Sequence, residues 1–450
     1  MVIQDATAPA ISAGDTAWVM ISTGLVLLMV PGLALFYGGL VRARAALNTF
    51  MMSFAALAVI LVQWVLVGYS MAFAPGRVIG DLRWAGFRDV TAVAGPYSAT
   101  IPHLSFAAFQ AMFAGITFAL ISGAIVERIR FRVYLVLAVV WSTIVYAPLA
   151  HWVWATDGWI RALGALDFAG GTVVHVSAGT AALVAALMIG RRRDLRRTAL
   201  VPHNVPFTIL GAGMLWFGWI GFNAGSALAA DGVAANALVT TVTAAATAFV
   251  AWMVLDMARG GRATAVGAAT GAVAGLVAIT PAAGFVTPVS ALAIGALGAV
   301  GSYVAIQLRS RSRIDDALDV FACHGVAGIL GAVLTGVFAT KSVNPLGADG
   351  LIAAGNWSLV GVQALAVLAT MAFVAPVTAL SLKAISLVTP LRLEVPREYT
   401  GVDLSEHSEH AYHDGEASDL AGGGVRIGEG VLLPAPQAKP ARLEPRASTA

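Results

Sequence analysis

The feature that most constrains this chain is a succession of long apolar segments separated by short polar breaks. A hydrocarbon core about 30 Å thick is crossed by roughly 20 apolar residues of helix, and a helix satisfies its own backbone hydrogen bonds in lipid. The sequence therefore predicts an all-α polytopic membrane protein with eleven transmembrane helices. The predicted helices lie near residues 17–39, 46–74, 104–126, 133–153, 168–190, 205–227, 233–257, 264–281, 287–308, 318–340 and 357–385.

The composition excludes a soluble globular fold. Charged residues make up 11% of the 450 residues, whereas soluble domains average about 25%, so the chain has too little polar surface to cover itself in water. Cys323 is the single cysteine, which rules out an internal disulfide and a cysteine-rich metal site. The sequence contains no P-loop, and the first apolar segment lacks the basic region that precedes a cleaved signal peptide. We expect no cofactor and no bound metal.

The basic residues predict the orientation of the bundle, because Arg and Lys concentrate in cytoplasmic loops. One set of alternate loops carries most of them: Arg42, Arg44, Arg128, Arg130, Arg132, Arg191, Arg192, Arg193, Arg196, Arg197, Arg259, Arg262, Arg309, Arg311 and Arg313. The other set carries Arg77, Arg83, Arg88, Arg161 and Lys341. The N-terminus is therefore expected outside and the C-terminus inside. The net charge of +3 is not gathered in one patch, which argues against nucleic-acid binding.

The composition also predicts four regions along the chain. Residues 1–16 are expected to form an extracytoplasmic segment, and residues 17–390 the transmembrane domain. Residues 391–420 are charged and are expected to form a cytoplasmic regulatory tail. Residues 421–450 are rich in Gly, Pro and Ala and are expected to be disordered, since they have little apolar area to offset chain entropy.

Two histidines share a motif in equivalent helices. "DFAGGTVVHVSAG" has Asp167 eight residues before His175, and "DALDVFACHGVAG" has Asp316 eight residues before His324. The first copy lies in the fifth predicted helix and the second in the tenth. Since five helices per copy is an odd number, the two copies are expected to be inverted, with sites at their interface near the membrane midplane.

The predicted repeats cover residues 17–190 and 205–340, and the helix at 357–385 stands outside them. A histidine in a membrane helix can simply hold two helices together, but intramembrane ionisable groups more often mark a pathway. Burial disfavours the imidazolium form, so both rings are expected to be neutral. Asp167 lies roughly 12 Å along the helix from His175. It either caps the start of that helix or helps to draw in a cation.

Aromatic side chains gather near the predicted outer ends of three helices. They are Phe109 and Phe113 in the third helix, Trp154 in the fourth, and Trp219 and Phe222 in the sixth, with Ser226 close by. Each is ordinary alone, as a packing residue or an interfacial anchor. Together, aromatic faces attract a small cation by up to about 2 kcal/mol each when desolvated, and a hydroxyl can accept its N–H.

A cation that enters hydrocarbon faces a prohibitive desolvation cost, so one that can lose a proton does so. Aromatic capture followed by an aromatic constriction and neutral imidazoles suits such a weak acid. Ammonium is the smallest such ion. The sequence also resembles the ammonium transporters, and in particular the Amt branch of the Amt/Mep/Rh superfamily. The resemblance extends from about residue 17 to residue 412 through "PGLALFYGGLVRARAALNTFM", "FQAMF", "ERIRF", "AHWVW", "DFAGGTVVHVSAG", "GWIGFNAGS", "DDALDVFACHGVAG" and "GVDLSEHSEHAY".

The resemblance implies a role for each of these side chains. It implies an external ammonium site from Trp154, Phe109 and Ser226, a gate from Phe113 and Phe222, a pore lined by His175, His324 and Trp219, and a vestibule supported by Asp167. It also implies a homotrimer with one pore per subunit in the inner (plasma) membrane, embedded in lipid, which transports ammonium or methylammonium. A cytoplasmic PII-type regulator is an implied partner, because the basic loop "RRRDLRR" lies on the expected side.

The sequence leaves alternatives to simple transport open. The chain departs from the family where the tail has His407, Ser408 and Glu409 in place of His-Gly-Glu, which places regulation in question more than conduction. A sensor that signals through its tail and a separate partner is one alternative, and an Rh-like gas channel is another. Catalysis is not expected, because the adjacent Cys323 and His324 point about 100° apart on a helix.

Overall fold

The computed structural model describes residues 11–195 and 201–412, and it is built almost entirely from helices. The expected disorder of 421–450 and part of the basic loop, residues 196 and 197, lie outside the described residues. The longer helices are α1 (Ala13–Leu40), α2 (Ala46–Gln63), α4 (His103–Ile125), α5 (Phe131–Trp141), α8 (Ser177–Ile189), α9 (Val205–Ala224), α10 (Gly232–Gly260), α11 (Ala265–Ile279), α12 (Pro288–Arg311), α13 (Ala327–Phe338) and α15 (Trp357–Val388).

Short elements extend or connect these helices. The short α-helices are α3 (Tyr69–Phe73), α6 (Ala147–Trp154), α7 (Trp159–Ala162), α14 (Leu351–Ala354), α16 (Val395–Thr400) and α17 (Val402–His407). The 3₁₀ turns are η1 (Ala43–Ala45), η3 (Ala85–Phe87) and η6 (Gly225–Ala227), and the wider π turns are η2 (Trp64–Gly68), η4 (Ser142–Tyr146), η5 (Gly171–Val176) and η7 (Phe321–Val326). The strands β1 (Ala94–Gly95) and β2 (Ser98–Pro102) form one antiparallel hairpin.

Ten helical segments of the described chain are long and apolar enough to cross a membrane. Each of the eleven predicted segments contains a helix, but the eighth, predicted at 264–281, is the 15-residue α11, which is shorter than the other ten. Its helix ends at Ile279, two residues before Pro281, and α12 starts only at Pro288, capped by the hydroxyl of Thr287. Thr280 still has helical backbone angles, but Pro281 has no N–H to continue the hydrogen-bond ladder and its ring clashes with the carbonyl four residues earlier, which explains the early end of α11.

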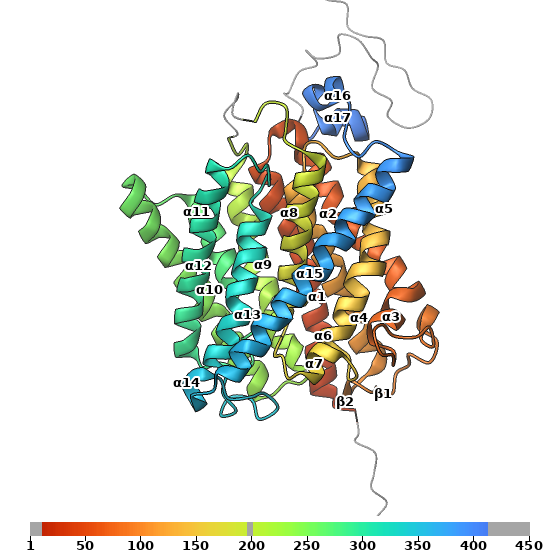
Figure 1. Ribbon diagram of the computed structural model, residues 1–450, viewed down its shortest axis with the longest axis vertical. Helices are drawn as coiled ribbons and strands as arrows, with labels where there is room; N and C mark the ends of the chain where they lie inside the picture. Colours follow the sequence, from red (N-terminus) through yellow and green to blue (C-terminus); the bar gives the residue numbers. More distant parts are fainter. Residues whose placement is uncertain (1–10, 196–200, 413–450) are drawn as a thin grey trace, which may run out of the picture.

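The helices pack side by side into one bundle with two distinct ends (Figure 1). We call the end with α16 and α17 the tail end, and the end with β1, β2, α7 and α14 the hairpin end. At the hairpin end the start of α1 is tied to β2, because the Ser12 amide donates to the Thr100 carbonyl at 2.8 Å. At the tail end, α9 starts where α1 finishes, because the Asn204 amide donates to the Gly39 carbonyl at 3.1 Å.

The two halves of the bundle make the same internal contacts. In the first half α1, α2 and α4 pack on one another, and α4 packs on α8. In the second half α9, α10 and α11 do the same, and α11 packs on α13. Because α1 starts at the hairpin end and α9 at the tail end, the halves run in opposite directions, as an inverted repeat requires. The halves meet where α1 packs on α9, and where η5 and η7 contact each other.

Candidate functional site

The two histidines of the repeated motif meet at the interface of the halves. His175 lies in η5 and His324 in η7, each in a π turn that leads into an α-helix, and such turns are frequent at functional sites. Their Nδ1 atoms are 3.3 Å apart and their ring centroids 5.4 Å apart, with the rings nearly parallel. The side chains are 1% and 3% exposed. One nitrogen of this close pair donates and the other accepts, so the two neutral rings are opposite tautomers.

The carboxylate of each motif caps the turn that carries its histidine. Asp167 accepts from five donors around the start of η5: the amides of Gly170, Gly171, Thr172 and Val173 and the hydroxyl of Thr172. Asp316 accepts from the amides of Val320 and Phe321 at the start of η7, at 3.0 and 2.7 Å. Amides without an intrahelical partner are thus satisfied in both copies, and Asp167 acts through the backbone rather than by touching His175.

A pair of phenyl rings covers the His175 side of this histidine pair. The rings of Phe113, from α4, and Phe222, from α9, are 4.3 Å apart between centroids. Phe222 stacks on His175 at 6.0 Å and Trp219 stacks on it at 5.4 Å. The Trp219 indole donates to the Thr280 hydroxyl at 2.9 Å, which fixes the plane of the ring. Sequence reasoning grouped these side chains, and the structure brings them together.

The three residues expected to bind a cation lie around the far side of the phenyl pair. The Trp154 ring meets Phe113 edge-on at 5.9 Å, and its indole donates to the Asp167 carbonyl at 3.0 Å. Phe109 packs on Phe113 at 4.9 Å and is fully buried. The Ser226 hydroxyl donates to the Phe222 carbonyl at 2.8 Å, so its oxygen lone pairs stay free to accept from a ligand.

Two cavities lie along the line from the phenyl pair to the tail end. The smaller, about 10 Å³, has apolar walls apart from the two histidines and Trp219. Nε2 of His175 is buried without a hydrogen-bond partner among the described residues. The larger cavity, about 390 Å³, has charged walls that include Arg42, Glu127 and Arg309. A volume of 10 Å³ holds at most one water-sized molecule, so the path narrows to molecular width beside the histidines.

Comparison with known proteins identifies the family that shares this architecture. Residues 17–412 match the model of the Ammonium Transporter Family. The chain belongs to the ammonium transporter family. It is 50% identical over 403 residues to an ammonium transporter of Bacillus subtilis, which covers 89% of this chain and 99% of that relative. The structure of Mep2 from Saccharomyces cerevisiae superposes with a TM-score of 0.80 at 38% identity, covering 86% of this chain and 88% of Mep2. A structure described as a sensor Amt protein gives a TM-score of 0.80 at 30% identity, covering 88% and 98% of the two chains.

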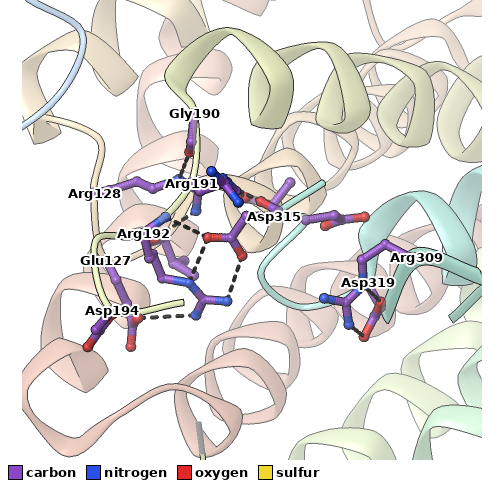
Figure 2. Close-up of polar contacts among 12 residues, drawn as sticks. Glu127, Arg128, Gly190, Arg191, Arg192, Asp194, Arg309, Asp315 and Asp319 are labelled. Carbon is purple, nitrogen blue, oxygen red and sulfur yellow. Dashed lines mark hydrogen bonds and ion pairs between the residues drawn. The ribbon is translucent and has the colours of Figure 1, made fainter. Parts of the chain in front are cut away.

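Figure 2 shows a buried ion network at the tail end of the bundle. This network was not predicted from the sequence. Arg192 bonds Asp315 through two nitrogens, at 2.7 and 3.0 Å, and reaches Glu127 at 3.1 Å. Glu127 also holds Arg42 at 2.6 Å. Burial alone would raise the pKa of Glu127, but the hydrogen bonds and charges of the two arginines outweigh it and hold the pKa below its usual value. These partners come from separate loops, so no spacing of residues within one segment of the sequence predicts the network.

Arg128 ties the same loops together through backbone carbonyls. Its guanidinium donates to the carbonyls of Ala124, Val126, Gly190 and Asp315, at 2.5 to 3.2 Å. Burial lowers the pKa of Arg128 to about 10, and it remains charged at neutral pH. The ends of α4 and α8 and the start of the second motif are therefore held by one side chain, and this fixes the wall of the larger cavity.

The tail docks on the first half of the bundle. Asp403 accepts from the amides of Leu47 and Asn48 at the start of α2, and His407 lies 2.9 Å from the Asn48 side-chain oxygen. Glu398 pairs with Arg392 and accepts from the Arg193 amide. Ser408 adopts a left-handed φ of 58°, a conformation that Gly takes freely and other residues at a cost of roughly 1–2 kcal/mol. The departure from His-Gly-Glu thus falls at a strained turn.

Proposed function

We propose that this multi-pass membrane protein takes up ammonium by capturing the cation at the hairpin end and passing ammonia between the two histidines. Trp154, Phe109 and Ser226 form the capture site, Phe113 and Phe222 the gate, His175, His324 and Trp219 the pore, and Asp167 supports the vestibule. The hairpin end then faces outward and the tail end the cytoplasm, with eleven spans in the inner membrane. Residues 1–16 are extracytoplasmic and 391–420 form the regulatory tail.

The unpartnered Nε2 of His175 carries this proposal. A buried nitrogen without a partner costs about 1–3 kcal/mol, and its residue, His175, lines the narrow apolar cavity directly behind the phenyl pair. When His175 donates through Nδ1, its Nε2 offers a lone pair to an N–H; when His324 donates, Nε2 of His175 carries the proton. Ammonia can bond to either tautomer because it has both N–H groups and a lone pair, whereas K⁺ and Na⁺ have neither.

Uptake into proteoliposomes tests the pore. With His175 and His324 both changed to Ala, we expect ammonium and methylammonium uptake to be lost. Ser177→Ala is the control, because Ser177 is buried at the end of η5 and its hydroxyl donates to the backbone carbonyls of Val173 and Val174 in that turn. Thermal unfolding of each variant reports whether it folds. Full uptake by a folded double variant would refute the pore assignment.

A sensor role is the second candidate, because Glu398 of the docked tail accepts from the amide of Arg193, the residue after Arg192 in the charged wall of the larger cavity, and a structure described as a sensor Amt protein shares this fold. Deletion of residues 391–450 separates the two. A transporter keeps ammonium-dependent growth and loses its regulation, whereas a sensor loses its signal. We further propose a homotrimer embedded in lipid and a cytoplasmic PII-type regulator that docks at the tail end.

A further inference from the structure

Three residues line both cavities and therefore stand where the cavities meet: Phe36, Val273 and His324. Phe36 comes from α1 and is 5% exposed, and Val273 comes from α11 and is 2% exposed. They separate a charged cavity of about 390 Å³ from an apolar one of about 10 Å³. His324 itself lines both cavities, whereas His175 lines only the smaller one, so Phe36 and Val273 flank the passage from the charged cavity to His175.

The repeat relates these two residues to the phenyl pair at the other side of the histidines. "LFYGG" at residues 35–39 of α1 aligns with "GFNAG" at 221–225 of α9, which makes Phe36 the counterpart of Phe222. "FAGITFA" at 113–119 of α4 aligns with "VAGLVAI" at 273–279 of α11, which makes Val273 the counterpart of Phe113. The helices occupy equivalent places, since α1 packs on α4 as α9 packs on α11.

We propose that Phe36 and Val273 form a second constriction, which keeps water and ions of the larger cavity away from the smaller cavity and His175 and limits the size of the transported molecule. It is the inverted counterpart of the phenyl pair, with one phenyl replaced by an isopropyl group. The constriction therefore offers one aromatic face where the phenyl pair offers two, so it attracts a cation less. In the same alignment Leu40 stands where Ser226 does, so the hydroxyl of the capture site has no counterpart here.

This inference rests on the proposed direction and pore, and its variants test the constriction separately. Val273→Phe rebuilds a double phenyl and narrows the path. Because one methylene in a tight apolar pocket changes discrimination by about 10-fold or more, we expect the ratio of ammonium to methylammonium uptake to rise about 10-fold. Phe36→Ala opens the path, and we expect osmotic water permeability of proteoliposomes to rise and the uptake ratio to fall.

Leu40→Ala is the matched control, because Leu40 lies one turn from Phe36 on α1 and lines the larger cavity but not the smaller one. It should leave both readouts at wild-type values. Phe36→Leu serves if Phe36→Ala does not fold, with a smaller rise in water permeability. A folded Val273→Phe variant that takes up neither substrate also supports the constriction. The constriction is refuted if folded Val273→Phe and Phe36→Ala both show the same uptake ratio and water permeability as Leu40→Ala. Water permeability is measured without ammonium, so this failure is distinct from failure of the proposed function.

Discussion

Replacing the Asp167 carboxylate by an amide tests whether Asp167 acts as a cap or as an attractor of cations. The carboxylate accepts from four consecutive amides and one hydroxyl. Asp167→Asn preserves the size of the side chain but replaces one acceptor oxygen with an NH₂ group. The NH₂ group faces N–H donors and cannot accept from them, so the hydrogen bonds that the replaced oxygen accepted are lost and not merely weakened.

The magnitude follows from the number of donors. The remaining oxygen of Asn has two lone pairs and can serve about two of the five donors, so at least three lose their partner. At the lower limit of about 1 kcal/mol for each unsatisfied buried group, Asp167→Asn lowers the free energy of unfolding by about 3 kcal/mol. Asp316→Asn is the matched variant in the second half. Asp316 serves two amides, which one oxygen can still accept from, so the expected loss is about 1–2 kcal/mol.

Thermal unfolding in detergent and amide hydrogen exchange at residues 170–173 measure the effect. We expect Asp167→Asn to be clearly the less stable of the two variants and to exchange these amides faster. Asp167→Glu keeps the charge but moves it by one methylene, so a cap is disturbed while an attractor is preserved. Equal stabilities of Asp167→Asn and Asp316→Asn, with unchanged exchange at 170–173, would refute the capping argument, and full stability of Asp167→Glu would favour attraction of a cation.

Two further predictions concern the tail end and the contact between the halves. Since its arginine partners hold the pKa of Glu127 below the usual 4.5, the stability that Glu127 contributes is complete above about pH 4.5 and is lost as the pH falls through the lowered folded-state value. Glu127→Gln should cost about 3–5 kcal/mol at pH 7, because it leaves buried arginine charge uncompensated, and the difference from wild type in an acid unfolding series should shrink toward zero. Gly179→Ala should also destabilise, because its Cβ would lie 2.3 Å from a backbone nitrogen of η7 and overpacking costs about 1–3 kcal/mol. Gly213→Ala, with nothing within 4 Å of its Cβ, should not, and equal thermal stabilities of the two glycine variants would contradict the proposed close contact.

Sequence reasoning predicted the helical segments well because hydropathy is a sum over about 20 residues and tolerates local irregularity. It predicted both ends of α11 to within two residues. It nevertheless overestimated the length of helix available to cross the membrane, because the predicted segment continues through Pro281. The histidine pair could be predicted because both copies keep the same spacing. The network of Arg42, Glu127 and Arg192 could not, because each partner comes from a different loop and only the folded bundle brings them within 3.1 Å.

The repeat is most informative where its two copies differ. A symmetric bundle would offer the same constriction and the same capture site on both sides of the histidines, and transport would have no structural reason to differ between the two ends. Three departures stand close to the path: Val273 for Phe113, Leu40 for Ser226, and Asp319 for Gly170. The last pair shares a positive φ, of 58° at Asp319 and 115° at Gly170, and Asp319 bonds Arg309 in the wall of the larger cavity. The hairpin side thus has aromatic rings and a free hydroxyl lone pair, whereas the tail side has an aliphatic constriction and paired charges. In the proposed mechanism a cation is attracted before the phenyl pair and a neutral molecule passes beyond it. The sequence differences between equivalent positions, more than the shared fold, would then set where ammonium is bound and where ammonia leaves.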